Sequence, residues 1–244
     1  MPPPAEVDAM NQVLDTKKTS DTASGLELDS LSMLRPHIEV VQRPMLPAMI
    51  KRLMDLTTAL TLLILAAPLI LGIALVIKLT SKGPVLFSQT RVGRGGLPFQ
   101  IYKFRSMVSN AEALMSDLLQ QNEKDGPIFK MRADPRVTKI GRWLRRYSID
   151  ELPQLFNIVR NDMSLVGPRP PIPSEVLKYE PWQLRRLSVT PGLTCIWQTS
   201  GRSHVSFAEW MHMDLNYIDQ WSLGLDTMLL LKTVKTVVTA DGAY

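Results

Sequence analysis

Cysteine and histidine are scarce in this chain, which has one cysteine and three histidines among 244 residues. Because Cys195 is the only cysteine, an intrachain disulfide and a cysteine metal cluster are both excluded, in agreement with a reducing cytoplasmic location. His37, His204 and His212 lack the spacing of metal ligands. The chain also has no glycine-rich P-loop and no GxGxxG fingerprint, so the nucleotide-binding motifs of the common α/β folds are absent.

Neither sign of charge dominates strongly. The chain has 28 Lys and Arg residues against 23 Asp and Glu residues, which gives a net charge of +5 and a pI near 9.4. This balance suits an anionic partner, and beside the apolar segment described next it favours a lipid surface or a phosphate over a nucleic acid. Residues 1–44 hold prolines and clusters of Ser, Thr and Asp without periodicity, which predicts a disordered N-terminal tail. About 200 residues then remain for one domain of ordinary size.

An uncharged apolar run extends from Leu56 to Ile77 and predicts a membrane helix. A straight helix of this length rises ~33 Å, enough to cross a hydrocarbon core of ~30 Å. Pro68 lies in the middle of the run, which bends most easily there. Basic residues flank both ends, and such residues stay on the cytoplasmic side. The residues alone leave two alternatives: a re-entrant hairpin over 45–82 that breaks at Pro68, or a single span with a proline kink.

Two β-rich runs follow, at Pro84–Gly93 and Pro98–Met107, and predict a hairpin. On the second run Lys103 and Arg105 are two residues apart, so they are expected to share one face of the strand. Two neighbouring cations suit a bound phosphate. The alternative is a solvated strand face near an anionic membrane.

Two further stretches predict amphipathic helices. Apolar residues at helical spacing between Ala111 and Leu119 predict a helix whose apolar face packs on the core or lies in the bilayer interface. The run from Leu223 to Val238 is apolar but contains Asp226 and two lysines, so a core or interfacial helix is expected there rather than a span. Together these elements predict an α+β fold that is rich in helices and has one small β-hairpin.

The densest group of candidate catalytic residues lies between Gly141 and Pro170. Residues 148–151 form an S-x-x-E capping box, which by itself predicts only the start of a helix. A carboxylate in the first turn of a helix is stabilised as an anion, so Asp150 is expected to stay ionised and available as a nucleophile or a metal ligand. Glu151 converges on the same site only where Pro153 distorts the turn.

Cations and further polar residues surround this pair of acids in the sequence: Arg145, Arg146, Asn161, Asp162 and the proline-stiffened segment 166–170. Acids next to cations suit a metal-bound phosphate. Mg²⁺ keeps several waters and takes one or two carboxylates plus substrate phosphates, so Asp150 and Glu151 suffice as its protein ligands.

Several segments resemble those of the bacterial sugar transferases, the monotopic polyprenyl-phosphate hexose-1-phosphate transferases that initiate exopolysaccharide assembly. The resemblance runs from about Lys51 to Tyr244, and the combination of motifs is far more specific than any single one. The chain looks like the minimal catalytic form, without the multi-span N-terminal region of larger members. The matching segments are KRLMD, GPVLFSQTRVG, YKFRSM, SIDELPQLFNIVRNDMSLVGPRP, PGLTCIWQTSGR and DLNYIDQWSLGLD.

The resemblance implies a two-step reaction. Asp150 would attack the sugar-bearing phosphate of a UDP-sugar and expel UMP, and undecaprenyl phosphate would then capture the phosphosugar from the enzyme. Glu151 would complete the catalytic dyad, and both acids would hold Mg²⁺. The family motifs also imply a supporting set that binds substrate near the dyad, namely Lys103, Arg105, Arg146, Arg169 and Asp214.

The resemblance further implies that Pro68 makes the re-entrant break. The protein would then lie in one leaflet of the bacterial inner membrane, with residues 83–244 as a catalytic domain on the cytoplasmic face. Cys195 stands where glycine is more usual in the family, and small apolar packing is expected of it. Galactose or glucose is the expected hexose by analogy. The sequence leaves a homodimer open.

Two other functions are compatible with these residues. A membrane-anchored assembly protein without catalysis would use the two acids only as a helix cap, replaceable at a cost of ~1 kcal/mol. Direct glycosyl transfer without a covalent intermediate would release UDP instead of UMP.

Overall fold

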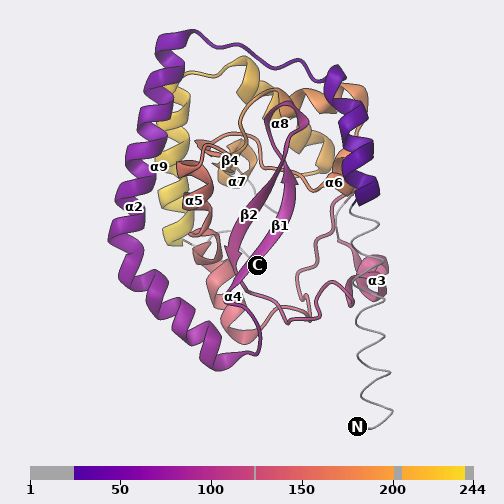
Figure 1. Cartoon of the computed structure of the whole chain (residues 1–244), viewed down its shortest axis with the longest axis vertical. Coiled ribbons are helices and arrows are strands. Elements are labelled where there is room, and N and C mark those ends of the chain that lie inside the picture. Colours follow the sequence, from indigo (N-terminus) through magenta and orange to yellow (C-terminus); the bar gives the residue numbers. More distant parts are fainter. Residues whose placement is uncertain (1–24, 124, 201–204, 240–244) are drawn as a thin grey trace.

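The computed structural model describes residues 25–123, 125–200 and 205–239. A long helix, α2 (Met45–Thr80), runs along one side of the molecule, with α9 (Leu223–Thr239) beside it (Figure 1). The short helix α5 (Gln154–Val159) packs between α2 and a two-stranded sheet. The main core lies where these elements meet and contains Ala59, Ile101, Leu155 and Leu229.

The predicted hairpin is confirmed. Strands β1 (Leu86–Val92) and β2 (Pro98–Phe104) pair antiparallel, from Leu86 opposite Phe104 to Val92 opposite Pro98. The turn between them, η2 (Arg94–Gly96), has φ values of 66° at Gly95 and 74° at Gly96. Glycine adopts this left-handed conformation without steric cost, which explains why the chain reverses here.

A second, smaller sheet lies in the core. Strand β3 (Ser164–Val166) is fully buried and runs parallel to β4 (Gly192–Thr194). The backbones approach so closely that a Cβ on Gly192 would lie 2.0 Å from the nitrogen of Gly167. The sequence analysis did not predict this sheet, because three-residue strands carry too little periodicity.

Short helices complete the chain and confirm a helix-rich α+β fold with a small hairpin. The predicted helix around residues 111–119 is reduced to one α-helical turn followed by a 3-10 turn, and the residues before it form turns. The remaining short elements are η1 (Arg35–His37), α3 (Met115–Leu118), η3 (Leu119–Gln121), α4 (Lys139–Arg146), η4 (Ile149–Glu151), α6 (Pro173–Val176), η5 (Pro181–Ser188), α7 (Ile196–Ser200) and α8 (Phe207–Asp219).

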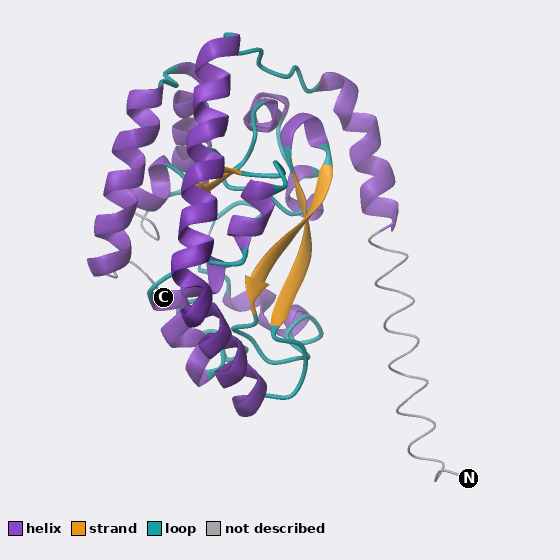
Figure 2. Ribbon diagram, turned by 60° about the vertical axis from the view of Figure 1, so that its left-hand side comes forward, coloured by secondary structure: helices purple, strands orange, loops and turns teal. Residues whose placement is uncertain are grey.

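Helix α2 is long and apolar enough to cross a membrane. It stays helical through Pro68 and changes direction in its second half (Figure 1, Figure 2). In its most apolar window only 11% of the residues are buried, so most of its leucines and isoleucines face outward. The structure therefore provides one bent apolar helix, and the re-entrant topology stays a prediction.

The predicted N-terminal tail is corrected for residues 25–44. Residues 25–34 form a helix, and Leu31 and Ile38 are buried in a cluster with residues of β1, α6 and η5. Leu28, Leu31 and Leu34 recur every three residues and so form one apolar face, which packs on the domain. Residues 1–24 of the predicted tail lie outside the described residues.

Candidate active site

Three separate segments bring charged side chains together around the turn η4. Glu151 in this turn accepts a hydrogen bond at Oε1 from Lys103 Nζ of β2, over 2.6 Å. The same oxygen accepts one from a guanidinium nitrogen of Arg169, over 3.3 Å, and Arg169 follows β3. All three side chains keep between 15% and 27% of their surface exposed. The cluster is therefore ordered by ion pairs and still accessible from outside.

The backbone of the dyad turn differs from the predicted capping box. Ser148 adopts a left-handed conformation with φ 55° and makes no capping hydrogen bond through its side chain. The 3-10 turn η4 follows, and α5 begins only after Pro153. The capping-box prediction is wrong because the Glu151 carboxylate binds Lys103 and Arg169 instead of the backbone of Ser148.

Asp150 is the unpaired member of the dyad. Its side chain is only 7% exposed, and within the described part of the chain no hydrogen bond or ion pair to its carboxylate is found. Burial raises the pKa of Asp150, with Glu151 adding to the effect, while Lys103 and Arg145 oppose it. A carboxylate that is poorly solvated and not engaged by protein donors is well suited to act as a nucleophile.

The pKa of Glu151 is shifted in the opposite direction. Burial by itself would raise its pKa, but the charges of Lys103 and Arg169 outweigh this and lower the pKa to about 2. Burial lowers the pKa of Lys103, and this effect is larger than the opposing effect of the Glu151 charge. The two adjacent acids thus have pKa values shifted in opposite directions, which is how active sites assign different roles to similar groups.

Arg145, not the predicted Arg146, faces the dyad. Both end helix α4, but neighbouring residues on a helix point about 100° apart. The Arg145 Nε donates to Ser106 Oγ over 2.9 Å, and the charge of Asp150 opposes the lowering of the Arg145 pKa by burial. Arg146 is exposed and lies over the ring of Tyr147 at 5.9 Å. The family motifs implied Arg146, and the rotation of α4 relative to the dyad cannot be read from a pair of adjacent residues.

We expect Arg145→Gln to lower kcat/KM by ~10- to 100-fold, since a charge-assisted hydrogen bond to substrate phosphate contributes ~1.5–3 kcal/mol. Arg146→Gln removes the same charge from an exposed position and is expected to change kcat/KM by less than ~3-fold. Steady-state kinetics on both purified variants compare the two positions directly. A larger loss in Arg146→Gln would contradict the placement of Arg145 at the dyad.

Arg105 does not share the face of Lys103 as predicted. Its guanidinium is buried and donates to the carbonyls of Lys82 and Ser81, at 2.8 and 2.9 Å, and to Ser81 Oγ at 2.6 Å. These acceptors lie just past the end of α2, where helix carbonyls lack partners within the helix. Arg105 therefore ties the end of α2 to the hairpin and is not brought to the dyad.

Asp214 is also set back from the dyad. It is fully buried in α8 and pairs with Arg186 of η5 over 2.7 Å. Burial raises the pKa of Asp214 to about 6 although Arg186 opposes this. Arg186 in turn donates to the carbonyl of Arg169 over 2.8 Å. Asp214 thus supports the site from behind, through Arg186 and the backbone of Arg169, and Arg186 is a residue that the sequence analysis missed.

The donor set fits Mg²⁺ bound together with phosphate. The described residues contain no group of three or more His, Cys, Asp or Glu side chains that could form a closed metal site. Across residues 25–123, 125–200 and 205–239 the Asp150 carboxylate has no protein donor, and the two cations on Glu151 both bind Oε1. Mg²⁺ needs only one or two carboxylates when water and substrate phosphates complete its shell. The two acids can therefore hold the ion predicted from the sequence.

The match to a family model decides the classification. The model described as "Bacterial sugar transferase" matches residues 46–240. The chain belongs to the bacterial sugar transferase family. The dyad, its cations and all of α2 except its first residue lie inside the matched region, whereas the helix at residues 25–34 lies outside it. The family that the sequence motifs indicated is therefore confirmed.

Named relatives support this assignment. The chain is 47% identical over 195 residues to "Galactosyl transferase CpsE" of Streptococcus agalactiae, a match over 79% of this chain and 43% of the relative. It is 44% identical to "UDP-glucose:undecaprenyl-phosphate glucose-1-phosphate transferase" of Caulobacter vibrioides, over 80% of this chain and 72% of the relative. It is 38% identical to "Exopolysaccharide production protein ExoY" of Rhizobium meliloti, over 80% and 88%. The chain thus spans less than half of the first of these relatives and most of the other two.

Proposed function

We propose that this family member is a phosphoglycosyl transferase that moves a hexose-1-phosphate from a UDP-sugar to undecaprenyl phosphate and releases UMP. The observation that carries the proposal is the Asp150 carboxylate, which no donor in the described part of the chain binds and which lies near the cations Lys103, Arg145 and Arg169. Relatives named for transfer to undecaprenyl phosphate and for exopolysaccharide production support the same reaction. The hexose is galactose or glucose, the two sugars in the relatives' names.

The reaction proceeds in two displacements at one phosphorus atom. A carboxylate oxygen of Asp150 attacks the sugar-bearing phosphorus, the bond from this phosphorus to the oxygen of UMP breaks, and UMP leaves. A phosphate oxygen of undecaprenyl phosphate then attacks the same phosphorus and displaces Asp150, which regenerates the carboxylate and yields the diphosphate-linked sugar. Covalent catalysis of this kind divides one transfer into two easier steps.

The other residues of the site bind charge and fix geometry. Lys103, Arg145 and Arg169 contact and neutralise the phosphate oxygens, which is the main electrostatic requirement of phosphoryl transfer. Glu151 stays ionised because of its low pKa and holds Lys103 and Arg169 in place. When bound, Mg²⁺ supplies further neutralisation of the phosphate charge, with Asp150 and Glu151 as its protein ligands.

The membrane helix gives the reaction its location. The acceptor is a long-chain lipid phosphate confined to the membrane surface, and the sugar nucleotide arrives from the cytosol. Basic residues at both ends of the apolar run favour the same, cytoplasmic side of the inner membrane. A re-entrant α2 bent at Pro68 satisfies this preference and places the domain at the surface where both substrates meet.

The deciding experiment is a nucleotide-release assay on detergent-purified protein with Mg²⁺, undecaprenyl phosphate and a panel of UDP-sugars. We expect UMP from one UDP-sugar, in amounts that depend on the lipid acceptor. UDP as the product would reject the covalent mechanism in favour of direct glycosyl transfer. Absence of lipid-dependent release with every sugar would favour the assembly-protein alternative.

A further inference from the structure

One turn of α2 holds two separate segments of the catalytic domain. The Arg52 guanidinium donates to the carbonyls of Ile158 and Val159, at 2.7 and 2.9 Å. These carbonyls belong to the last turn of α5, where the backbone lacks partners within the helix. Arg52 therefore fixes the end of α5 to α2 through a two-pronged contact.

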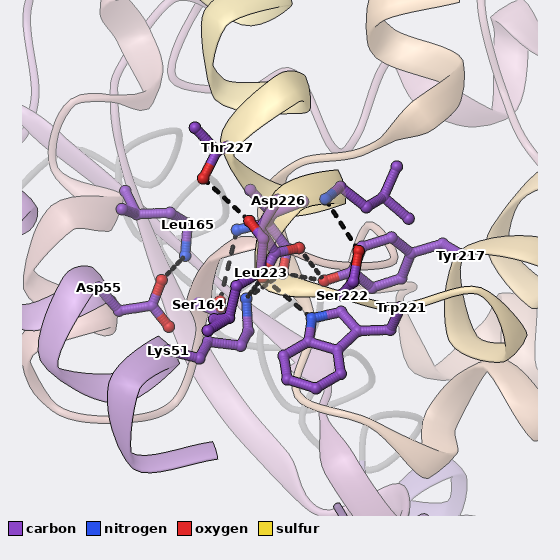
Figure 3. Close-up of polar contacts among 12 residues, drawn as sticks. Lys51, Asp55, Ser164, Leu165, Tyr217, Trp221, Ser222, Leu223, Asp226 and Thr227 are labelled. Atoms are coloured by element: carbon purple, nitrogen blue, oxygen red, sulfur yellow. Dashed lines mark hydrogen bonds and ion pairs between the residues drawn. The ribbon is translucent and has the colours of Figure 1, made fainter. Parts of the chain in front are cut away.

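The same stretch of α2 also holds β3. Asp55 Oδ1 accepts a hydrogen bond from the backbone nitrogen of Leu165 over 3.0 Å (Figure 3). Lys51 Nζ donates to the carbonyl of Val166 over 3.1 Å. Lys51, Arg52 and Asp55 lie within five residues of each other on one helix. These three side chains therefore link α5 and β3 to one short stretch of α2.

A buried carboxylate keeps Lys51 in this position. Asp226 of α9 is 2% exposed and pairs with Lys51 over 2.6 Å. It also accepts hydrogen bonds from the Tyr217 hydroxyl, over 2.8 Å, and from the Trp221 indole, over 3.0 Å. Figure 3 shows these side chains converging on one point from α2, α8, α9 and, for Trp221, the loop between α8 and α9. Three donors around one carboxylate leave Lys51 little freedom to change its geometry.

The two segments that α2 holds lead directly to the two partners of the Glu151–Arg169 ion pair. Helix α5 begins three residues after Glu151, and β3 ends three residues before Arg169. A six-residue helix is a rigid rod of ~9 Å, and β3 is locked in the core between α2 and β4. Glu151 is thus connected to α2 through the short helix α5, and Arg169 is connected to the same part of α2 through the short strand β3.

We propose that Lys51, Arg52 and Asp55 are positioning residues that transmit the placement of α2 in the membrane to the geometry of the catalytic dyad. The inference rests on the proposed function for its kinetic consequence only. The ion pair forms across two segments that share no strand and no helix, so their common support on α2 contributes to its distance, beside the contacts of Lys103 and Arg186. A displacement of ~1 Å at a reacting group can cost ~10²-fold in rate, so such support is a kinetic requirement as well as a structural one.

The test compares Arg52→Gln with Lys78→Gln. Lys78 lies on the other flank of the same helix, is exposed, and loses the same charge without releasing a catalytic segment. We expect Arg52→Gln to lower kcat ~10²-fold while KM for the UDP-sugar changes less than ~3-fold, and Lys78→Gln to stay within ~3-fold in both. Arg52→Lys keeps one donor and is expected to recover part of the lost kcat.

Hydrogen exchange provides a readout that does not depend on activity. Loss of the Arg52 contacts is expected to speed amide exchange at 150–160 at least ~10-fold, with the rest of the domain unchanged. Asp55→Ala is expected to do the same at 163–169, and it replaces Arg52→Gln should that variant not fold. Unchanged exchange at 150–160 in Arg52→Gln, or an unchanged kcat in the folded variant, would overturn the inference. A wild-type protein that releases no UMP would overturn the proposed function instead. The exchange result would then still show whether the contacts of α2 hold the segments that carry Glu151 and Arg169.

Discussion

Asp150→Asn is expected to leave the protein folded and to lower turnover by ~10⁴-fold or more, the size of effect seen when an essential member of a nucleophilic site is removed. The amide has nearly the same shape but cannot displace UMP from phosphorus. Folding should be retained because no donor among the described residues binds the Asp150 carboxylate, which is buried. Burial also raises the pKa of Asp150, so the surroundings disfavour its charged form and a neutral amide is not expected to weaken the fold.

The measurements are UMP release and thermal unfolding of the same preparation. Wild-type protein given its UDP-sugar without lipid should also gain the mass of a hexose phosphate on the peptide that contains Asp150, and Asp150→Asn should not. An unchanged melting temperature with lost turnover supports the nucleophile. Retained turnover in Asp150→Asn would contradict it and would move the covalent step to another residue.

Arg186→Met is expected to destabilise the fold by ~3–5 kcal/mol, because it leaves the buried Asp214 carboxylate without its cation. Arg186 is fully buried and donates to Asp214, to the Tyr179 hydroxyl and to the carbonyl of Arg169. Methionine fills a similar volume but replaces none of these bonds. Unfolding in detergent measures the loss, and Arg185→Met is the control, since its neighbouring guanidinium is half exposed and pairs with Asp219 at the surface.

The loss of stability in Arg186→Met should depend on pH in a defined direction. Burial already raises the pKa of Asp214 to about 6, and removal of the cation raises it further, against ~3.9 in the unfolded chain. A carboxyl group with a raised pKa destabilises the folded state when it is ionised, and the penalty shrinks as falling pH protonates it. We therefore expect the deficit relative to wild type to be larger at pH 8 than at pH 5. The same deficit at both values would contradict the role of Asp214.

Local features of the fold were predictable from the sequence. The hairpin was, because Gly95 and Gly96 provide the left-handed turn and the flanking runs are rich in strand formers. The apolar run gave α2, although the helix extends beyond both ends of the run. Asp150 and Glu151 stood out in the sequence as adjacent acids at a predicted helix start, whereas the family motifs implied that Lys103 and Arg169 lie near them.

Features that depend on long-range packing were not predictable. Ser148 matches a capping box, but the tertiary ion pairs of Glu151 override the local preference. Arg105 has the spacing of a partner to Lys103, yet its guanidinium donates hydrogen bonds to the backbone at the end of α2 instead. The helix at residues 25–34 looked like part of a polar tail, because its three leucines gain stability only against the domain. In each case the deciding partner lies far away in the sequence.

The buried thiol of Cys195 has a practical consequence for work on this protein. The side chain is 2% exposed, and burial raises the pKa of its thiol well above the ordinary value. Since the thiolate is the form that alkylating reagents modify, Cys195 of the folded protein is not expected to react with sulfhydryl reagents. Met49 and Leu79, near opposite ends of α2, are 61% and 75% exposed. Cysteines introduced there one at a time would be the sole targets of a membrane-impermeant maleimide, so each flank of the helix can be assigned to a side of the bilayer without removing a native residue.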